Sequence, residues 1–202
     1  MNQSIWQELM TRVGFSENTK TYNQLLSHYN QKHRYYHNIH HINAVLNHLK
    51  QVRHLANNYD AIEIALWFHD AIYKIFSSTN ELDSANWATS FLDKNGASQE
   101  LSTKVHALIM ATLHNTIPID NDEKLMVDID LSILGCTPDF YSSFESWIRK
   151  EYKLIPGFVY KKKRKEILSS FLVRDRIYSH DFFYEKLEQT ARANIKNAIS
   201  HL

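Results

Sequence analysis

The adjacent residues His69 and Asp70 lie inside the most apolar stretch of the chain, AIEIALWFHDAIYKIF, which covers positions 61–76. Burial of an ionised carboxylate without a partner is very unfavourable, so Asp70 must pair with a neighbour or coordinate a metal ion. A histidine nitrogen beside a carboxylate oxygen suits Mn, Fe, Co, Ni or Zn. The pair alone therefore leaves two interpretations open: a buried His–Asp hydrogen bond, and part of a transition-metal site.

Histidines are concentrated in a second segment, because six of the 12 in the chain lie between His28 and His48. His37 and His41 are four residues apart, a spacing that places both on one face of a helix. His41 also begins an apolar stripe and should point inward. A lone inward histidine is more often a core residue than a ligand, but the His–Asp pair elsewhere favours a ligand role for His41. His37 stays undecided between the two roles.

A third polar group, Asp128 and Asp130, lies within the apolar segment LMVDIDLSIL at 125–134. One carboxylate could bind the metal while the other supports the site by hydrogen bonding. Alternatively, one caps a helix and the other faces solvent.

The elements that must position these residues are predicted to be helices, because apolar residues recur with helical spacing nearly throughout. Only four glycines and three prolines are present, which disfavours a turn-rich β fold. Asp60–Glu63 and Ser78–Glu81 match the capping-box pattern, and Gly96 is predicted to follow a helix end. The predicted helices cover 4–12, 18–32, 38 onward, 61–76, 78–96, 99–114, 125–134, 138–152, 159–173 and 180–199.

Composition predicts one globular domain over residues 1–202, with 137–202 as an alternative C-terminal helical lobe. The net charge of +1 argues against a protein built around nucleic acid or an acidic membrane. Cys136 is the single cysteine, which indicates a reducing compartment. No secretory signal or membrane-spanning stretch is evident. We therefore expect a cytoplasmic protein without a membrane partner.

The ordered set His…His-Asp…Asp in an all-helical chain resembles the HD superfamily of metal-dependent phosphohydrolases. On this resemblance, His41 corresponds to the first histidine, His69 and Asp70 to the pair that names the family, and Asp130 to the final aspartate. Asp130 is preferred to Asp128 because the sequence LSILG that follows it is similar to the helical continuation in several members.

Residues 30–195 are also similar to a bacterial branch of small stand-alone HD proteins, described only as predicted metal-dependent phosphohydrolases. The resemblance implies an all-α, compact HD-type helical bundle. It also implies one or two divalent transition-metal ions (Mn, Zn, Ni, Co or Fe) and hydrolysis of a phosphoester by metal-activated water. The resemblance itself implies no particular substrate, and our leading hypothesis is a small phosphoester, with a nucleotide among the candidates. The segments that carry the similarity are YHN at 36–38, NELDSA at 80–85, ATLH at 111–114, IRKEY at 148–152 and ARAN at 191–194.

Four further residues are candidates for catalysis or substrate binding alongside the ligand Asp70. Glu81 is a candidate general acid or base, or else the reach-back member of a capping box. His114 could donate a proton, bind phosphate or ligate a second metal, or else simply end a helix. Arg34 is the best candidate for a phosphate clamp, because its guanidinium fork matches phosphate. His37 is the second substrate-binding candidate.

Three other functions stay open on sequence alone. The spare histidines are compatible with a dinuclear-iron oxygenase of HD type, and the site could instead serve a non-enzymatic nucleotide sensor. The basic run YKKKRK at 160–165 could bind nucleic acid, although Glu166 follows it and a solvated helix face is favoured. Metal identity, metal number and formation of a homo-oligomer are left open.

Overall fold

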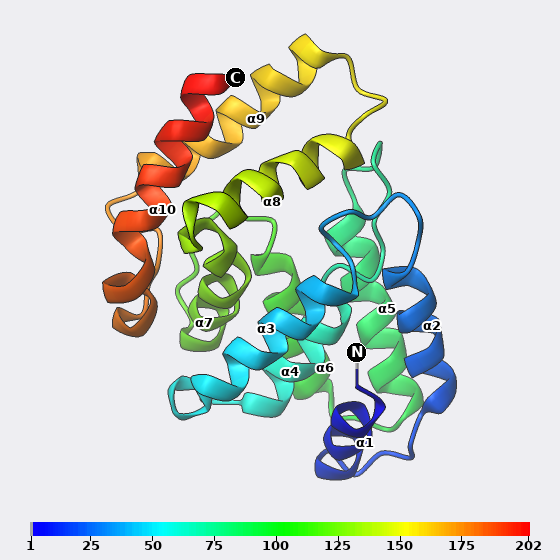
Figure 1. Ribbon diagram of the computed structural model, residues 1–202. Coiled ribbons are helices and arrows are strands. Elements are labelled where there is room, and N and C mark those ends of the chain that lie inside the picture. The colour runs from blue at the N-terminus through cyan, green and yellow to red at the C-terminus, as the bar shows by residue number, and fades with distance from the viewer. Residues whose placement is uncertain (1) are drawn as a thin grey trace. The chain divides into compact units, whose positions relative to one another are not determined.

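The computed structural model describes residues 2–202 and is all-helical over that range (Figure 1). It contains ten α-helices and two short 3₁₀ helices, and no β-strand among the described residues. The all-α fold class predicted from periodicity and composition is confirmed. The chain divides into two compact units, one up to Met126 and the other Val127–Leu202. The division falls within a single helix, α7 (Asn121–Asp130).

The first unit holds six complete α-helices, a 3₁₀ helix and the start of α7. They are α1 (Gln3–Arg12), α2 (Thr19–Tyr29), α3 (Ile39–Gln51), η1 (Arg53–Leu55), α4 (Tyr59–Phe68), α5 (Asn80–Lys94) and α6 (Gln99–Ala111).

Helix α4 is the centre of the first unit, since it packs against α1, α3, α5 and α6. Every side chain from Ala61 to Phe68 is buried. Trp67 meets Trp6 of α1 edge-on, with 5.3 Å between ring centroids. A helix with neighbours on all sides buries all of its faces, which explains why this segment has no polar face.

The start of α4 differs from the predicted capping box. Asn58 is the N-cap, and its Oδ1 accepts the Ala61 N–H at 3.0 Å. Asp60 instead accepts a hydrogen bond from Arg12, and Glu63 pairs with the same guanidinium. The prediction was wrong because an arginine from α1 recruits both acidic side chains, while the asparagine two residues earlier satisfies the free N–H group.

The second predicted capping box is also wrong, because α5 begins at Asn80 with Thr79 at the cap position and no side-chain cap bond there. The predicted end of this helix is correct. Gly96 has φ +75° and its N–H donates to the Asp93 carbonyl, as expected for a glycine that follows a helix end.

The buried carboxylate of Glu63 gives a first prediction. Glu63 is 3% exposed and its partner Arg12 is 30% exposed. Burial raises the pKa of Glu63, and the Arg12 cation opposes that shift. Arg12→Met should therefore lower the free energy of unfolding at pH 7 by about 3 kcal/mol, the low end for a buried carboxylate that loses its partner.

The pH dependence of this variant identifies the cause. With a raised carboxyl pKa, the folded variant binds more protons than the unfolded chain, so its stability deficit should shrink as pH falls from 7 toward 5. Urea unfolding at both pH values measures this deficit. Lys163→Met, which removes one side of the exposed Lys163–Glu166 pair, should change stability little at either pH. An equal Arg12→Met deficit at both pH values would show that Glu63 is not responsible.

The second unit contains the end of α7, one 3₁₀ helix and three α-helices. Helix α10 packs against each of the others after α7. Gly135, in the 3₁₀ helix, lets α10 pack closely against it, because a Cβ at this position would lie 2.5 Å from the Leu187 Cβ. The elements are η2 (Leu131–Gly135), α8 (Pro138–Glu151), α9 (Gly157–Leu172) and α10 (Asp181–His201).

None of the helices in residues 2–202 combines the length and the apolar character needed to cross a bilayer.

Candidate metal centre

Two of the four predicted metal ligands, His69 and Asp70, follow the end of α4. The helix stops at Phe68, with His69 at the C-cap position and Asp70 in the turn beyond it. The prediction that the helix continues to Phe76 was wrong. Side chains from other elements hydrogen-bond the backbone carbonyls that follow Asp70, and these contacts take the place of helical hydrogen bonds.

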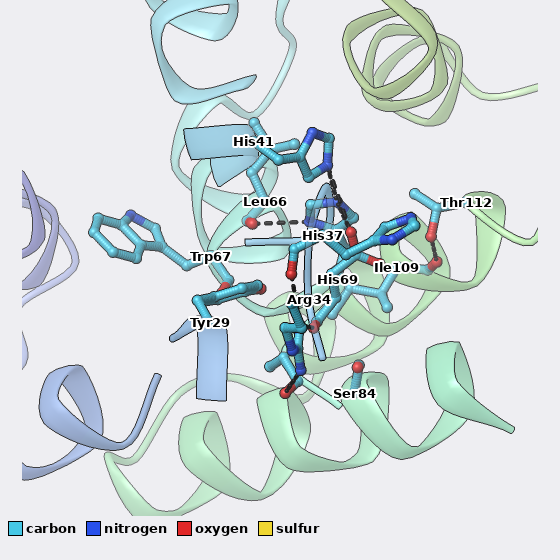
Figure 2. A network of polar contacts seen from close by, with 12 residues as sticks. Tyr29, Arg34, His37, His41, Leu66, Trp67, His69, Ser84, Ile109 and Thr112 are labelled. Carbon is cyan, nitrogen blue, oxygen red and sulfur yellow. Dashed lines mark hydrogen bonds and ion pairs between the residues drawn. The ribbon is translucent and has the colours of Figure 1, made fainter. Parts of the chain in front are cut away.

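The His69 ring has a fixed orientation and tautomer. Its Nδ1 lies 2.9 Å from the Leu66 carbonyl oxygen (Figure 2). A carbonyl oxygen only accepts hydrogen bonds, so Nδ1 carries the proton and donates. The neutral ring then has its lone pair on Nε2, the atom available to a metal ion. Because His69 is 1% exposed, this Nε2 faces a protected site rather than bulk water.

Three donor atoms converge beside this Nε2. His41 Nε2 lies 3.1 Å from His69 Nε2, and Asp70 Oδ2 lies 3.2 Å from His69 Nε2 and 3.5 Å from His41 Nε2. Ligand atoms bound about 2.0–2.1 Å from one ion lie roughly 2.8–3.4 Å apart in octahedral or tetrahedral coordination. The separations of 3.1, 3.2 and 3.5 Å are in or close to this range, as expected for ligands of a single transition-metal ion.

Asp130, the predicted fourth ligand, is the last residue of α7. It belongs to the second unit, whereas His41, His69 and Asp70 belong to the first, so its role as fourth ligand stays a prediction. Two imidazoles with carboxylate oxygens are a donor set suited to Mn, Fe, Co, Ni or Zn.

The electrostatics of Asp70 favour the charged form that a metal requires. Burial alone would raise the pKa of its carboxyl group. The rings of His69, His37 and His41 outweigh burial and hold the pKa well below its usual value. Asp70 is therefore a carboxylate at neutral pH, with 17% of its side chain exposed to solvent.

His37 lies near His41 and Asp70, two of the proposed ligands. Its ring stacks on Tyr73 at 4.4 Å between centroids and lies 6.2 Å from the His41 ring. The prediction that His37 and His41 share one helical face was wrong, because His37 lies before α3, whose N-cap is Asn38. The two rings are nevertheless neighbours.

Arg34, the predicted phosphate clamp, is 5% exposed and is directed at the backbone. Its Nη1 donates to the carbonyls of His37 at 3.0 Å and Asp70 at 2.6 Å, and its Nη2 donates to Ala71 at 2.9 Å (Figure 2). The guanidinium also lies over the rings of Tyr29 and Tyr73. These contacts favour a structural role within the site over contact with a phosphate group.

Glu81 and His114 lie within electrostatic reach of the cluster. Burial raises the pKa of Glu81 and the charge of Asp70 raises it further, while His114 and His37 oppose the shift. Glu81 is in the first turn of α5. His114 follows α6 in the left-handed backbone region, at φ +55°. Both catalytic candidates thus belong to the same half-buried environment as Asp70.

Three residues near Asp70 were not predicted from the sequence. His28 and His33 contact the carbonyls of Ala71 and Tyr73, and Ser84 contacts the backbone of Ile72. The concentration of histidines between positions 28 and 48 was a signal for the first two. Ser84 follows Glu81 by three residues and gave no signal of its own.

Asp128 and the basic run belong to different environments in the second unit. The Asp128 carboxylate accepts the N–H groups of Ser179 and His180 and pairs with the His180 ring. In the basic run, Tyr160 is buried and Arg164 makes a two-pronged bond to Glu145. Asp128 therefore anchors a loop, and the run does not present all of its cations to solvent.

No protein-family model matches this chain, and no curated protein or solved structure in the searches matches it either.

Proposed function

We propose that this chain is a metal-dependent hydrolase of the HD type that cleaves a small phosphoester, a nucleotide among the candidates. The observation that carries the proposal is the convergence of His41 Nε2, His69 Nε2 and Asp70 Oδ2 at 3.1–3.5 Å. The hydrogen bond from His69 Nδ1 to Leu66 supports it, because it presents Nε2 as a ligand. The single cysteine favours the cytoplasm as its location.

We assign the metal to His41, His69, Asp70 and Asp130. A divalent ion bound there supplies Lewis acidity, which activates water and stabilises negative charge on phosphoryl oxygens. The surrounding residues supply what phosphoester hydrolysis also needs. Glu81, whose pKa is raised by burial, is the general acid or base that moves a proton between water and the leaving group, and His114 is the alternative. His37 binds the substrate beside the ligands.

A loading and turnover experiment tests this proposal. The protein, purified without chelator or immobilised metal, is incubated separately with Mn, Zn, Ni, Co and Fe. Metal per chain is measured by elemental analysis, and phosphate release is followed on a panel of small phosphoesters. We expect one or two ions per chain and phosphate release that stops with chelator and returns with metal. A chain that binds none of these ions, or releases phosphate equally without them, would refute the proposal.

The role of Glu81 gives a separate prediction. Glu81→Gln should lower kcat by about 10²–10⁴, the usual contribution of general acid–base catalysis, and leave the metal content unchanged. Steady-state kinetics together with elemental analysis separate these two quantities. Glu100→Gln is the matched control, because Glu100 occupies the first turn of α6 as Glu81 does that of α5. Unchanged kcat in the Glu81 variant would remove this residue from the mechanism.

A further inference from the structure

The segment His69–Lys74, here called the ligand loop, carries two of the proposed metal ligands without regular secondary structure. Such a segment leaves backbone groups without helical or strand partners, and buried backbone groups must find partners elsewhere. The N–H groups of His69 and Ala71 donate to carbonyls of α4, and side chains from other elements bond the rest of the loop from Asp70 to Lys74. The loop therefore depends on tertiary contacts for its conformation.

Arg34 provides two of these contacts, both at the start of the loop. Its guanidinium donates to the carbonyl of Asp70 and to that of the next residue, Ala71, at 2.6 and 2.9 Å. It also donates to the carbonyl of His37 at 3.0 Å. One planar group thus joins the backbone of the proposed ligand Asp70 to the segment that leads into α3, the helix that carries His41.

Residues near Arg34 in sequence extend this set of contacts. His28 Nδ1 lies 2.9 Å from the Ala71 carbonyl, and His33 Nε2 lies 3.0 Å from the Tyr73 carbonyl. Both ring nitrogens must carry the proton, because carbonyl oxygens only accept. Three side chains from positions 28–34 therefore hold the carbonyls of Asp70, Ala71 and Tyr73 in the ligand loop.

Helix α5 holds the loop through two further side chains. The Ser84 hydroxyl accepts the Ile72 N–H at 3.0 Å. Asn80 makes a reciprocal pair with Lys74: its Oδ1 accepts the Lys74 N–H at 2.9 Å, and its Nδ2 donates to the Lys74 carbonyl at 3.0 Å. The ligand loop is thus bonded to side chains of two separate segments of the chain.

Arg34 is buried, so its guanidinium depends on these hydrogen bonds for stability. Desolvating a guanidinium is costly, and a buried charge persists only where hydrogen bonds satisfy it. Hydrogen bonds from a charged donor contribute more to stability than those from a neutral donor. Metal sites need ligands held within about 0.5 Å of productive geometry. A rigid fork bonded to the backbone of a ligand residue can provide that accuracy, whereas a flexible ammonium cannot.

We infer that Arg34 is the positioning residue of the metal site: through the carbonyls of Asp70, Ala71 and His37 it fixes the Asp70 carboxylate beside His69 and His41. The inference rests on the proposed metal-binding function. It replaces contact with phosphate as the role of Arg34. The two roles differ in outcome, because a positioning residue controls metal affinity and ligand geometry before any substrate is present.

Cobalt binding tests this inference without reference to catalysis. Wild type, Arg34→Lys and Ser84→Ala are titrated with Co²⁺, and affinity and the visible d–d spectrum are recorded. Arg34→Lys should bind Co²⁺ about 10–100-fold more weakly, the usual effect of losing a partner that orients a ligand, and its spectrum should shift. Ser84→Ala loosens the same loop from α5 and should produce a smaller change of the same kind.

The matched control is Arg192→Lys. Arg192 likewise holds three backbone carbonyls, those of Leu172, Arg174 and Asp175, but it lies in the second unit. This variant should lose thermal stability while keeping the wild-type cobalt affinity and spectrum. A shifted spectrum in Arg34→Lys but not in Arg192→Lys would separate positioning from a general loss of stability.

Two results would overturn the inference in different ways. Wild-type cobalt affinity and spectrum in both Arg34→Lys and Ser84→Ala, particularly with weakened binding of inorganic phosphate in Arg34→Lys, would return Arg34 to the role of a phosphate clamp. Failure of the wild-type protein to bind Co²⁺ or any other divalent ion would refute the proposed function, and the positioning role with it.

Discussion

Asp70→Asn should weaken binding of a divalent metal ion by at least about 100-fold while the helical content stays unchanged. The change keeps the size of the side chain but removes the negative charge and one of three converging donor atoms. Loss of a residue that merely orients a ligand already costs about 10–100-fold in affinity, so loss of a ligand should cost more. Metal-dependent phosphate release should fall with metal content.

Elemental analysis, metal titration and circular dichroism of the purified variant measure the three quantities. Asp181→Asn is the control, because Asp181 is an exposed carboxylate whose partner is Arg176. This control should bind metal as the wild-type protein does. If Asp70→Asn keeps the full metal content and affinity, the His–Asp pair is a structural hydrogen bond and the proposed ligand set is incorrect. If it keeps metal but loses turnover, Asp70 acts on the substrate instead.

The sequence was sufficient to predict the fold class because the helical signals are local. Apolar residues at helical spacing, together with few glycines, predict helices that pack against one another. Gly96 follows the end of α5 with a positive φ, a conformation that depends on this residue alone. Local signals fail where distant side chains compete for the same groups. Asp60 and Glu63 pair with Arg12 instead of capping the helix. The sequence around position 60 does not indicate this partner, which is about 50 residues earlier in the chain.

The same distinction applies to the candidate site. The sequence identified His41, His69 and Asp70 as candidate ligands because polar residues at buried positions are rare and need a partner. The end of α4 at Phe68 could not, since the residues on both sides of the pair have helical apolar spacing. What ends the helix is the set of side chains that bonds the ligand loop, and most of those come from 28–34, about 40 residues earlier.

Arg34 shows why residue type alone is a weak guide to role. A guanidinium fits a phosphate and a set of carbonyl oxygens equally well. Which partner the guanidinium binds depends on whether the side chain is buried among backbone carbonyls. For Arg34 these carbonyls belong to the 69–74 segment, which is close to it only in the folded protein. The sequence placed this arginine beside the histidine cluster, and its residue type alone favoured phosphate as the partner.

Substitutions of Asp128 and Asp130, the two aspartates at the end of α7, should have opposite effects on stability and on metal affinity. Asp128 is fully buried, and its carboxylate is bonded by Ser179 and His180. Asp128→Ala leaves two backbone N–H groups and an imidazole without their acceptor, so the free energy of unfolding should fall by about 3–5 kcal/mol. Asp130→Ala removes a half-buried side chain at the helix end and should change that free energy by about 1 kcal/mol or less.

Metal affinity should respond in the opposite order. Asp130→Ala should lower it by at least about 100-fold, because a proposed ligand is lost, whereas folded Asp128→Ala should bind metal with nearly wild-type affinity. Urea unfolding and metal titration of both variants measure the two effects, and Asp128→Asn offers a milder change if the alanine variant does not fold. Loss of metal from the Asp128 variants with retention in Asp130→Ala would exchange the two assignments. It would make Asp128 the final ligand, despite the loop that its carboxylate holds.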